Sequence, residues 1–129
     1  YNYVGQPWRT QEIVDEVLHT LYFNNPDGLS GNEDCGQMSA WYILNAMGFY
    51  QVCPGKPVYS IGRPLFNEAT VHLKDGKSFK VIAHNNSRDN KYVRSIVLNG
   101  NKLETPFFTH QDIVDGGTLE LTMGSEPLK

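Results

Sequence analysis

The fold is decided by one stretch of sequence, residues 31–47, which reads GNEDCGQMSAWYILNAM. A glycine-rich turn with two adjacent carboxylates leads into a predicted helix over residues 34–47, and Gly48 is a natural helix stop. The large apolar residues of this helix point in nearly every direction: Met38, Trp41, Tyr42, Ile43, Leu44 and Met47. A helix that is apolar all round is buried on all sides. We therefore expect the chain to be a piece of a larger fold, unless the strands that follow cover this helix.

The segment before this stretch is predicted to be an amphipathic helix over residues 7–23. Pro7 suits the first turn, where its missing N–H costs nothing. Apolar residues recur at helical spacing along one stripe: Ile13, Val14, Val17, Leu18, Leu21 and Tyr22. The run from Asn24 to Gly28 then ends the helix and turns the chain.

From Tyr59 onward the apolar period changes to two, which indicates strands. Asp75-Gly76 and Asn99-Gly100 each separate two such strands and predict hairpins. We expect an antiparallel meander forming a small β-sheet or one layer of a sandwich, with a short helical turn at 110–113. The fold class is therefore α+β, with a helical part at 1–52 and a β region at 53–129.

The composition excludes two classes of partner. The 129 residues include 40% hydrophobic and 19% charged residues, and the formal net charge is −3. No cluster of lysine and arginine is present, so we expect no nucleic acid and no anionic membrane as a partner. No apolar run approaches the ~20 residues of a membrane-spanning helix.

The residues best placed for chemistry are the adjacent carboxylates Glu33 and Asp34. An ionised carboxylate on a loop beside a buried helix is placed to activate water as a general base. The alternative is that both only cap the helix, because acidic residues are favoured in first turns. Trp8 could stack on a sugar. The four histidines show no pair at metal-ligand spacing.

Residues 31–42 resemble the signature of glycoside hydrolase family 92, the α-mannosidases. Further segments match on both sides: YNY at 1–3, GQPW at 5–8, PDGL at 26–29, GFY at 48–50, CPG at 53–55, Gly62, PLF at 64–66, LNG at 98–100 and HQDI at 110–113. The resemblance covers essentially the whole chain, and its central motif is long and specific.

The resemblance implies that residues 1–52 are the last two helices of an (α/α)₆ barrel and that the chain is the C-terminal segment of a longer enzyme. It implies an inverting, calcium-dependent exo-α-mannosidase acting on mannose-containing glycans, often at α-1,2 links. Asp34 would be the general base, Asn32 would position the attacking water, and Glu33 would support the loop. The general acid and most calcium ligands would lie outside this segment, and the enzyme would be periplasmic or secreted.

These expectations lead to two predictions about the isolated chain. Without the acid it is inactive as a hydrolase, and its exposed apolar helix surface makes it self-associate. The alternative function is a non-catalytic carbohydrate-binding or structural β-module, which would have no reason to carry a helix that is apolar all round.

Overall fold

The structure, a computed structural model, describes all residues from 1 to 129. Its helices are α1 (Pro7–Thr20), α2 (Gln37–Met47) and α3 (His110–Val114), with single 3-10 turns at Asn2–Val4, Asp34–Gly36 and Lys74–Gly76. Its strands are β1 (Phe49–Tyr50), β2 (Val58–Ile61), β3 (Glu68–His72), β4 (Ser78–His84), β5 (Tyr92–Leu98), β6 (Asn101–Lys102), β7 (Phe107–Thr109) and β8 (Gly117–Gly124). No helix is long and apolar enough to cross a bilayer.

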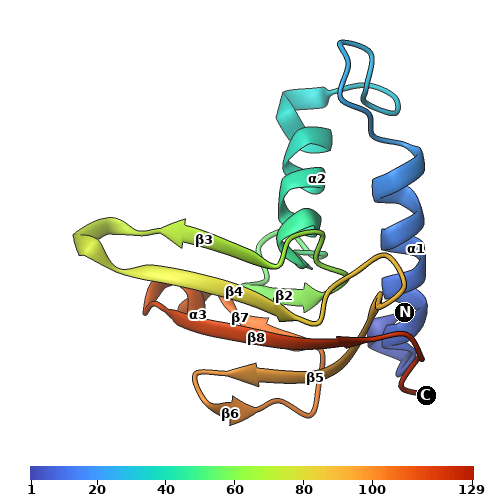
Figure 1. The fold of residues 1–129 in the computed structure, drawn as a ribbon. Coiled ribbons are helices and arrows are strands. Elements are labelled where there is room, and N and C mark those ends of the chain that lie inside the picture. Colours follow the sequence, from blue (N-terminus) through green and yellow to red (C-terminus); the bar gives the residue numbers. More distant parts are fainter.

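The helices α1 and α2 stand side by side and run in opposite directions, with the loop that joins them at the end far from the sheets (Figure 1). Both are shorter than predicted. The first ends at Thr20 because Tyr22 turns onto α2, where its ring lies 5.5 Å from Trp41. The second begins at Gln37 because Cys35 and Gly36 both have left-handed backbone, with φ values of 56° and 78°.

The strands form a five-stranded sheet in the order β3-β4-β8-β5-β6 and a three-stranded sheet in the order β1-β2-β7. Both predicted hairpins are present. The expected antiparallel meander is wrong at the centre, because β8 lies between β4 and β5 and runs parallel to β4. The physical reason is burial: Leu119 and Leu121 of β8 are 0% exposed, and only a central position covers them on both sides.

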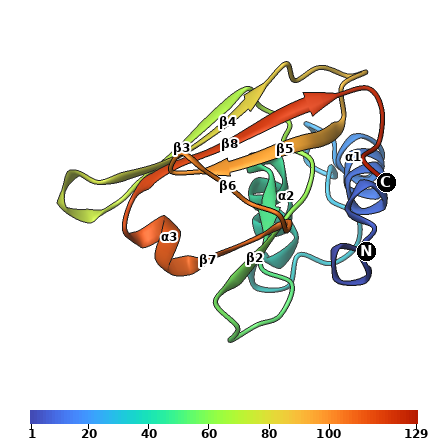
Figure 2. The ribbon, with the colours of Figure 1, turned by 90° about the horizontal axis from the view of Figure 1, so that it is seen from below.

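The core lies between the two sheets, so the chain is a mixed α+β structure with two packed layers. Figure 2, the view from below, shows β2, β7 and α3 on one side of the large sheet. Phe108 of β7 joins the layers, since its ring stacks on Phe79 of β4 at 5.7 Å and meets Phe49 of β1 edge-on at 5.3 Å. The buried core residues are Phe49, Ile61, Phe79, Val81, Ala83, Val93, Leu98, Phe108, Ile113, Leu119, Leu121 and Met123.

The first helix is tied to the sheets by polar contacts. The backbone N–H of Val93 in β5 donates to the side chain of buried Gln11 at 3.1 Å. Arg63, which is 3% exposed, lies with its Nε 2.9 Å from Asp15 of α1. A buried charge of this kind needs its partner, because an unpaired one would be costly. These contacts hold α1 against the sheets and leave the loop end of the helices free.

The second helix is not enclosed by the rest of the chain. Ala46, near its C-terminal end, is buried, but Ile43, one turn earlier on the same helix, is 56% exposed. The strands therefore do not supply the missing cover, and the apolar face remains open within these residues.

Candidate active-site loop

The acidic loop lies at the free end of the helix pair, between the end of α1 and the start of α2 (Figure 1). Asn32, Glu33 and Asp34 are adjacent there, and all three are exposed. The structure thus presents the three residues predicted from the sequence on one surface. The helix predicted over residues 34–47 would have begun at Asp34, but Asp34 lies in the 3-10 turn that precedes α2.

The loop reverses sharply immediately after Asp34. Cys35 and Gly36 are consecutive left-handed residues, and the regular helix starts directly after them. A left-handed conformation is unfavourable for a residue that has a Cβ atom, so the Cys35 backbone must be held by contacts elsewhere in the loop.

Glu33 supplies such a contact. Its carboxylate accepts hydrogen bonds from the backbone N–H of Ser39 at 3.1 and 3.2 Å and from the Ser39 hydroxyl at 3.0 Å. Ser39 is the third residue of α2, so this N–H has no partner within the helix. The negative charge also lies at the positive end of the helix dipole. The carboxylate of Glu33 is therefore engaged within the protein.

Asp34 and Asn32 differ from Glu33 in this respect. Neither side chain makes a hydrogen bond or an ion pair within the chain. A free carboxylate next to a free amide can accept a proton from a water molecule while the amide holds that water. Of the two adjacent carboxylates, Asp34 is accordingly the one that is available for general-base chemistry.

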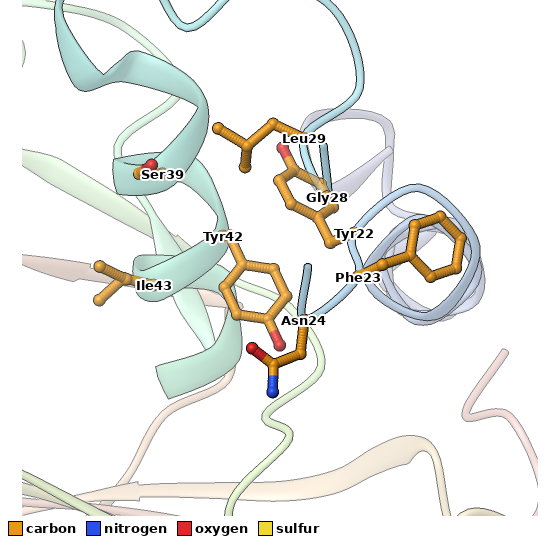
Figure 3. Close-up of a pocket in the computed structure, with 8 residues that line it drawn as sticks. All are labelled: Tyr22, Phe23, Asn24, Gly28, Leu29, Ser39, Tyr42 and Ile43. Carbon is orange, nitrogen blue, oxygen red and sulfur yellow. The ribbon is translucent and has the colours of Figure 1, made fainter. Parts of the chain in front are cut away.

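A cavity of about 400 Å³ lies beside the loop, between α2 and residues 22–29 (Figure 3). The rings of Tyr22 and Tyr42 project into the space between the two segments, with centroids 5.0 Å apart. Burial raises the pKa of the Tyr22 hydroxyl, and the negative charge of Glu33 raises it further. The phenol is therefore a neutral hydrogen-bonding group near the loop at physiological pH. The lining residues are Tyr22, Phe23, Asn24, Gly28, Leu29, Ser39, Tyr42 and Ile43.

Trp8 is not brought to this loop. It lies at the start of α1, and the 14 residues of that helix separate it by about 20 Å from the loop that follows. There it lines a smaller groove with residues of β5 and of the segment 102–106. Any sugar that Trp8 contacts would occupy a different place from a sugar at Asp34.

The chain does not gather a metal site from its own ionisable side chains. No three residues among its histidines, cysteines, aspartates and glutamates come together to hold an ion. The ionisable residues of 1–129 do not form a calcium site by themselves.

Comparison with known proteins identifies the family. The model of the glycosyl hydrolase family 92 catalytic domain matches residues 1–125. The chain belongs to glycosyl hydrolase family 92. Because the match is to the catalytic domain of this family, it favours the glycosidase over a separate non-catalytic module.

Relatives in this family include solved structures from Bacteroides thetaiotaomicron. The chain is 48% identical to a family 92 inverting mannosidase, with a TM-score of 0.90 over 98% of its residues. It is 42% identical to a family 92 α-mannosidase in complex with mannoimidazole, with a TM-score of 0.93 over 99% of its residues. Each alignment covers 17% of the relative's chain.

A relative from Arthroderma benhamiae, named as a secreted glycosidase, is 30% identical over 98% of the chain and is covered over 17% of its own length. The chain thus spans about a sixth of the family members it matches. In each of these relatives, about five-sixths of the protein lies outside the segment that this chain matches.

Sequence reasoning missed two residues of the loop region. Ser39 follows Glu33 by six positions, and only the reversal at Cys35 and Gly36 brings them together. Tyr22 was predicted as part of the apolar stripe of α1 but lies beyond its end, close to Glu33. A serine near the start of the helix predicted over residues 34–47 was the one available signal for the first of these.

Proposed function

We propose that residues 1–129 are the C-terminal part of an inverting, calcium-dependent exo-α-mannosidase in which Asp34 is the general base. The observation that carries this proposal is that the two adjacent carboxylates of the acidic loop differ in their hydrogen bonding. Glu33 is engaged by Ser39, whereas the carboxylate of Asp34 is exposed and unpaired. The proposal is supported by family membership and by the 48% identity to an inverting mannosidase.

The chemistry assigns separate tasks to residues inside and outside the chain. In an inverting glycosidase an acid protonates the leaving oxygen while a base activates water on the opposite face, with the two carboxyl groups ~6.5–9.5 Å apart. Asp34 accepts one proton from the attacking water while the oxygen of that water bonds to the anomeric carbon. Asn32 orients that water through its amide but cannot take its proton. Glu33 is adjacent to Asp34 and engaged by Ser39, so the acid comes from the remainder of the enzyme.

The remaining features of the proposal concern partners and location. Most ligands of the calcium ion lie outside residues 1–129. The substrate is a mannose-containing glycan, which the mannoimidazole complex of a relative supports. Export to the periplasm or medium is supported by the secreted relative.

Replacement of the base tests the proposal in the full-length enzyme. Asp34→Asn keeps the size of the side chain but removes its basicity, so we expect kcat to fall by about 10²–10⁴-fold with little change in KM. Steady-state hydrolysis of an aryl α-mannoside measures both constants. Asp27→Asn, at another exposed carboxylate of the same loop region, serves as the matched control and should retain activity. Near-normal turnover by Asp34→Asn would refute the assignment.

The stereochemistry is tested separately by proton NMR during early hydrolysis. Inversion at an α-mannoside releases β-mannose first, and the α anomer then appears by mutarotation. Initial release of α-mannose would contradict the inverting mechanism while leaving the family assignment intact.

A further inference from the structure

We propose that Ser39 is a positioning residue for the general base, acting through the carboxylate of Glu33. This inference rests on the proposed role of Asp34 and extends it to a residue on α2. The contact is bidentate: backbone and side chain of one serine grip both oxygens of the carboxylate at 3.0 to 3.2 Å.

The position of the contact explains why it acts on Asp34. Glu33 precedes Asp34 directly, and the two left-handed residues Cys35 and Gly36 follow it. Asp34 is therefore fixed on its N-terminal side by the Glu33–Ser39 contact and on its C-terminal side by the start of α2. Without the contact, the unfavourable backbone of Cys35 can relax and carry the Asp34 peptide with it.

The Ser39 hydroxyl contributes something that the backbone N–H cannot. In a Ser39→Ala variant the backbone N–H would still donate to the carboxylate of Glu33. The hydroxyl donates the third hydrogen bond, to Oε2 of Glu33. This bond restricts rotation of the carboxylate group. Charge-assisted hydrogen bonds of this kind are stronger than neutral ones.

Glu33 and Ser39 therefore act together to fix the position of Asp34. Small displacements of a catalytic group are costly, because a misplacement near 1 Å lowers turnover by about 100-fold. Loss of one of three hydrogen bonds displaces the loop less than this, so we expect an effect on kcat of about tenfold.

The test compares variants of the full-length enzyme. Ser39→Ala should lower kcat about tenfold at unchanged KM and unchanged melting temperature, whereas Ser39→Thr, which keeps the hydroxyl, should restore most of the loss. Ser30→Ala removes an exposed serine of the same loop that makes no side-chain hydrogen bond, and serves as the control. Normal kcat in Ser39→Ala, or no rescue by threonine, would overturn the proposal.

A double variant separates positioning of the base from general support of the fold. If Ser39 acts through Asp34, then adding Ser39→Ala to Asp34→Asn should cause no further loss of kcat. A further loss as large as in the wild type would overturn the inference and leave Asp34 as the base. Normal turnover by Asp34→Asn alone would instead refute the proposed function.

Glu33→Gln tests the same contact from the glutamate side. The amide oxygen can still accept from the Ser39 N–H, but the charge-assisted hydrogen bond with the Ser39 hydroxyl is lost. We expect a loss of kcat that is not increased by adding Ser39→Ala. Independent, multiplicative losses would show that the two residues do not act as a unit.

Discussion

At the scale of single residues, one carboxylate outside the loop joins the first helix to the large sheet. Glu12 of α1 accepts hydrogen bonds from Arg9 at 2.7 Å and from the hydroxyl of Tyr92 on β5 at 2.8 Å. The hydrogen bond from Arg9, followed by that from Tyr92, lowers the pKa of Glu12. Because the folded protein favours the ionised form, Glu12 contributes stability wherever it is ionised.

The sign of this pKa shift predicts a pH dependence. The contribution is complete above the unfolded pKa of about 4.3 and is lost as the pH falls through the lower folded value. Glu12→Gln should therefore destabilise the chain by about 1 kcal/mol at pH 7, and its deficit should shrink as the pH falls below the unfolded pKa. Thermal unfolding followed by circular dichroism across this range measures the difference.

Glu16→Gln, at an exposed position of the same helix, is the control for Glu12→Gln and should change little at any pH. A deficit of Glu12→Gln that stays constant throughout acid titration of the folded protein would show that packing rather than ionisation is responsible.

At the scale of elements, the loop after α1 determines how the acidic segment approaches α2. The backbone N–H of Phe23 donates to the carbonyl of Gly28 at 2.9 Å, which closes a tight turn beside the cavity. A Cβ atom at Gly28 would lie 1.8 Å from the Phe23 carbonyl oxygen, which is backbone and cannot swing away. The turn therefore has room only for glycine.

Gly28→Ala should in consequence open this turn. We expect a loss of about 1–3 kcal/mol in the free energy of unfolding, the range typical of an overpacked position, measured by urea denaturation. Gly62→Ala is the matched control, since a Cβ atom there meets its nearest neighbours at an ordinary 3.8 Å. Equal losses at the two glycines would contradict the steric explanation.

At the scale of the whole molecule, the helix end opposite the sheets is the incomplete part of the structure. Ile43 of α2 is 56% exposed, and Phe23 of the adjoining loop is 58% exposed. Both lie at the cavity beside the acidic loop (Figure 3). Exposed apolar side chains of this kind favour association with another protein surface.

The isolated 129-residue chain should accordingly self-associate and release no mannose from an aryl mannoside. Sedimentation velocity at rising concentration measures the association. Ile43→Lys should shift the population toward the monomer, because a charge cannot be buried there without a partner. Val4→Lys, at an apolar residue 69% exposed beyond the other end of α1, is the control. A monomer at all concentrations, or measurable hydrolysis, would contradict the prediction.

The sequence was most informative where the signal is local. The periodicity of residues 78–84 and 92–98 predicted strands β4 and β5, and the dipeptides at 75–76 and 99–100 predicted the turns beside them. These features depend on neighbouring residues alone. The place of β8 could not be predicted in this way. Its alternating pattern is compatible with an edge or a central position in the sheet, and with a parallel or an antiparallel neighbour.

By itself the sequence determined the α+β class, the two helices, most of the strands and the membership in family 92, since all of these follow from periodicity and motif. Only the tertiary structure decided that β8 lies parallel to β4 and that Ser39 grips Glu33 while Asp34 stays free. The physical reason is the range of the interactions. Helix and turn propensities act over a few residues, whereas strand order is set by burial in three dimensions and the loop contact by the backbone reversal at Cys35 and Gly36.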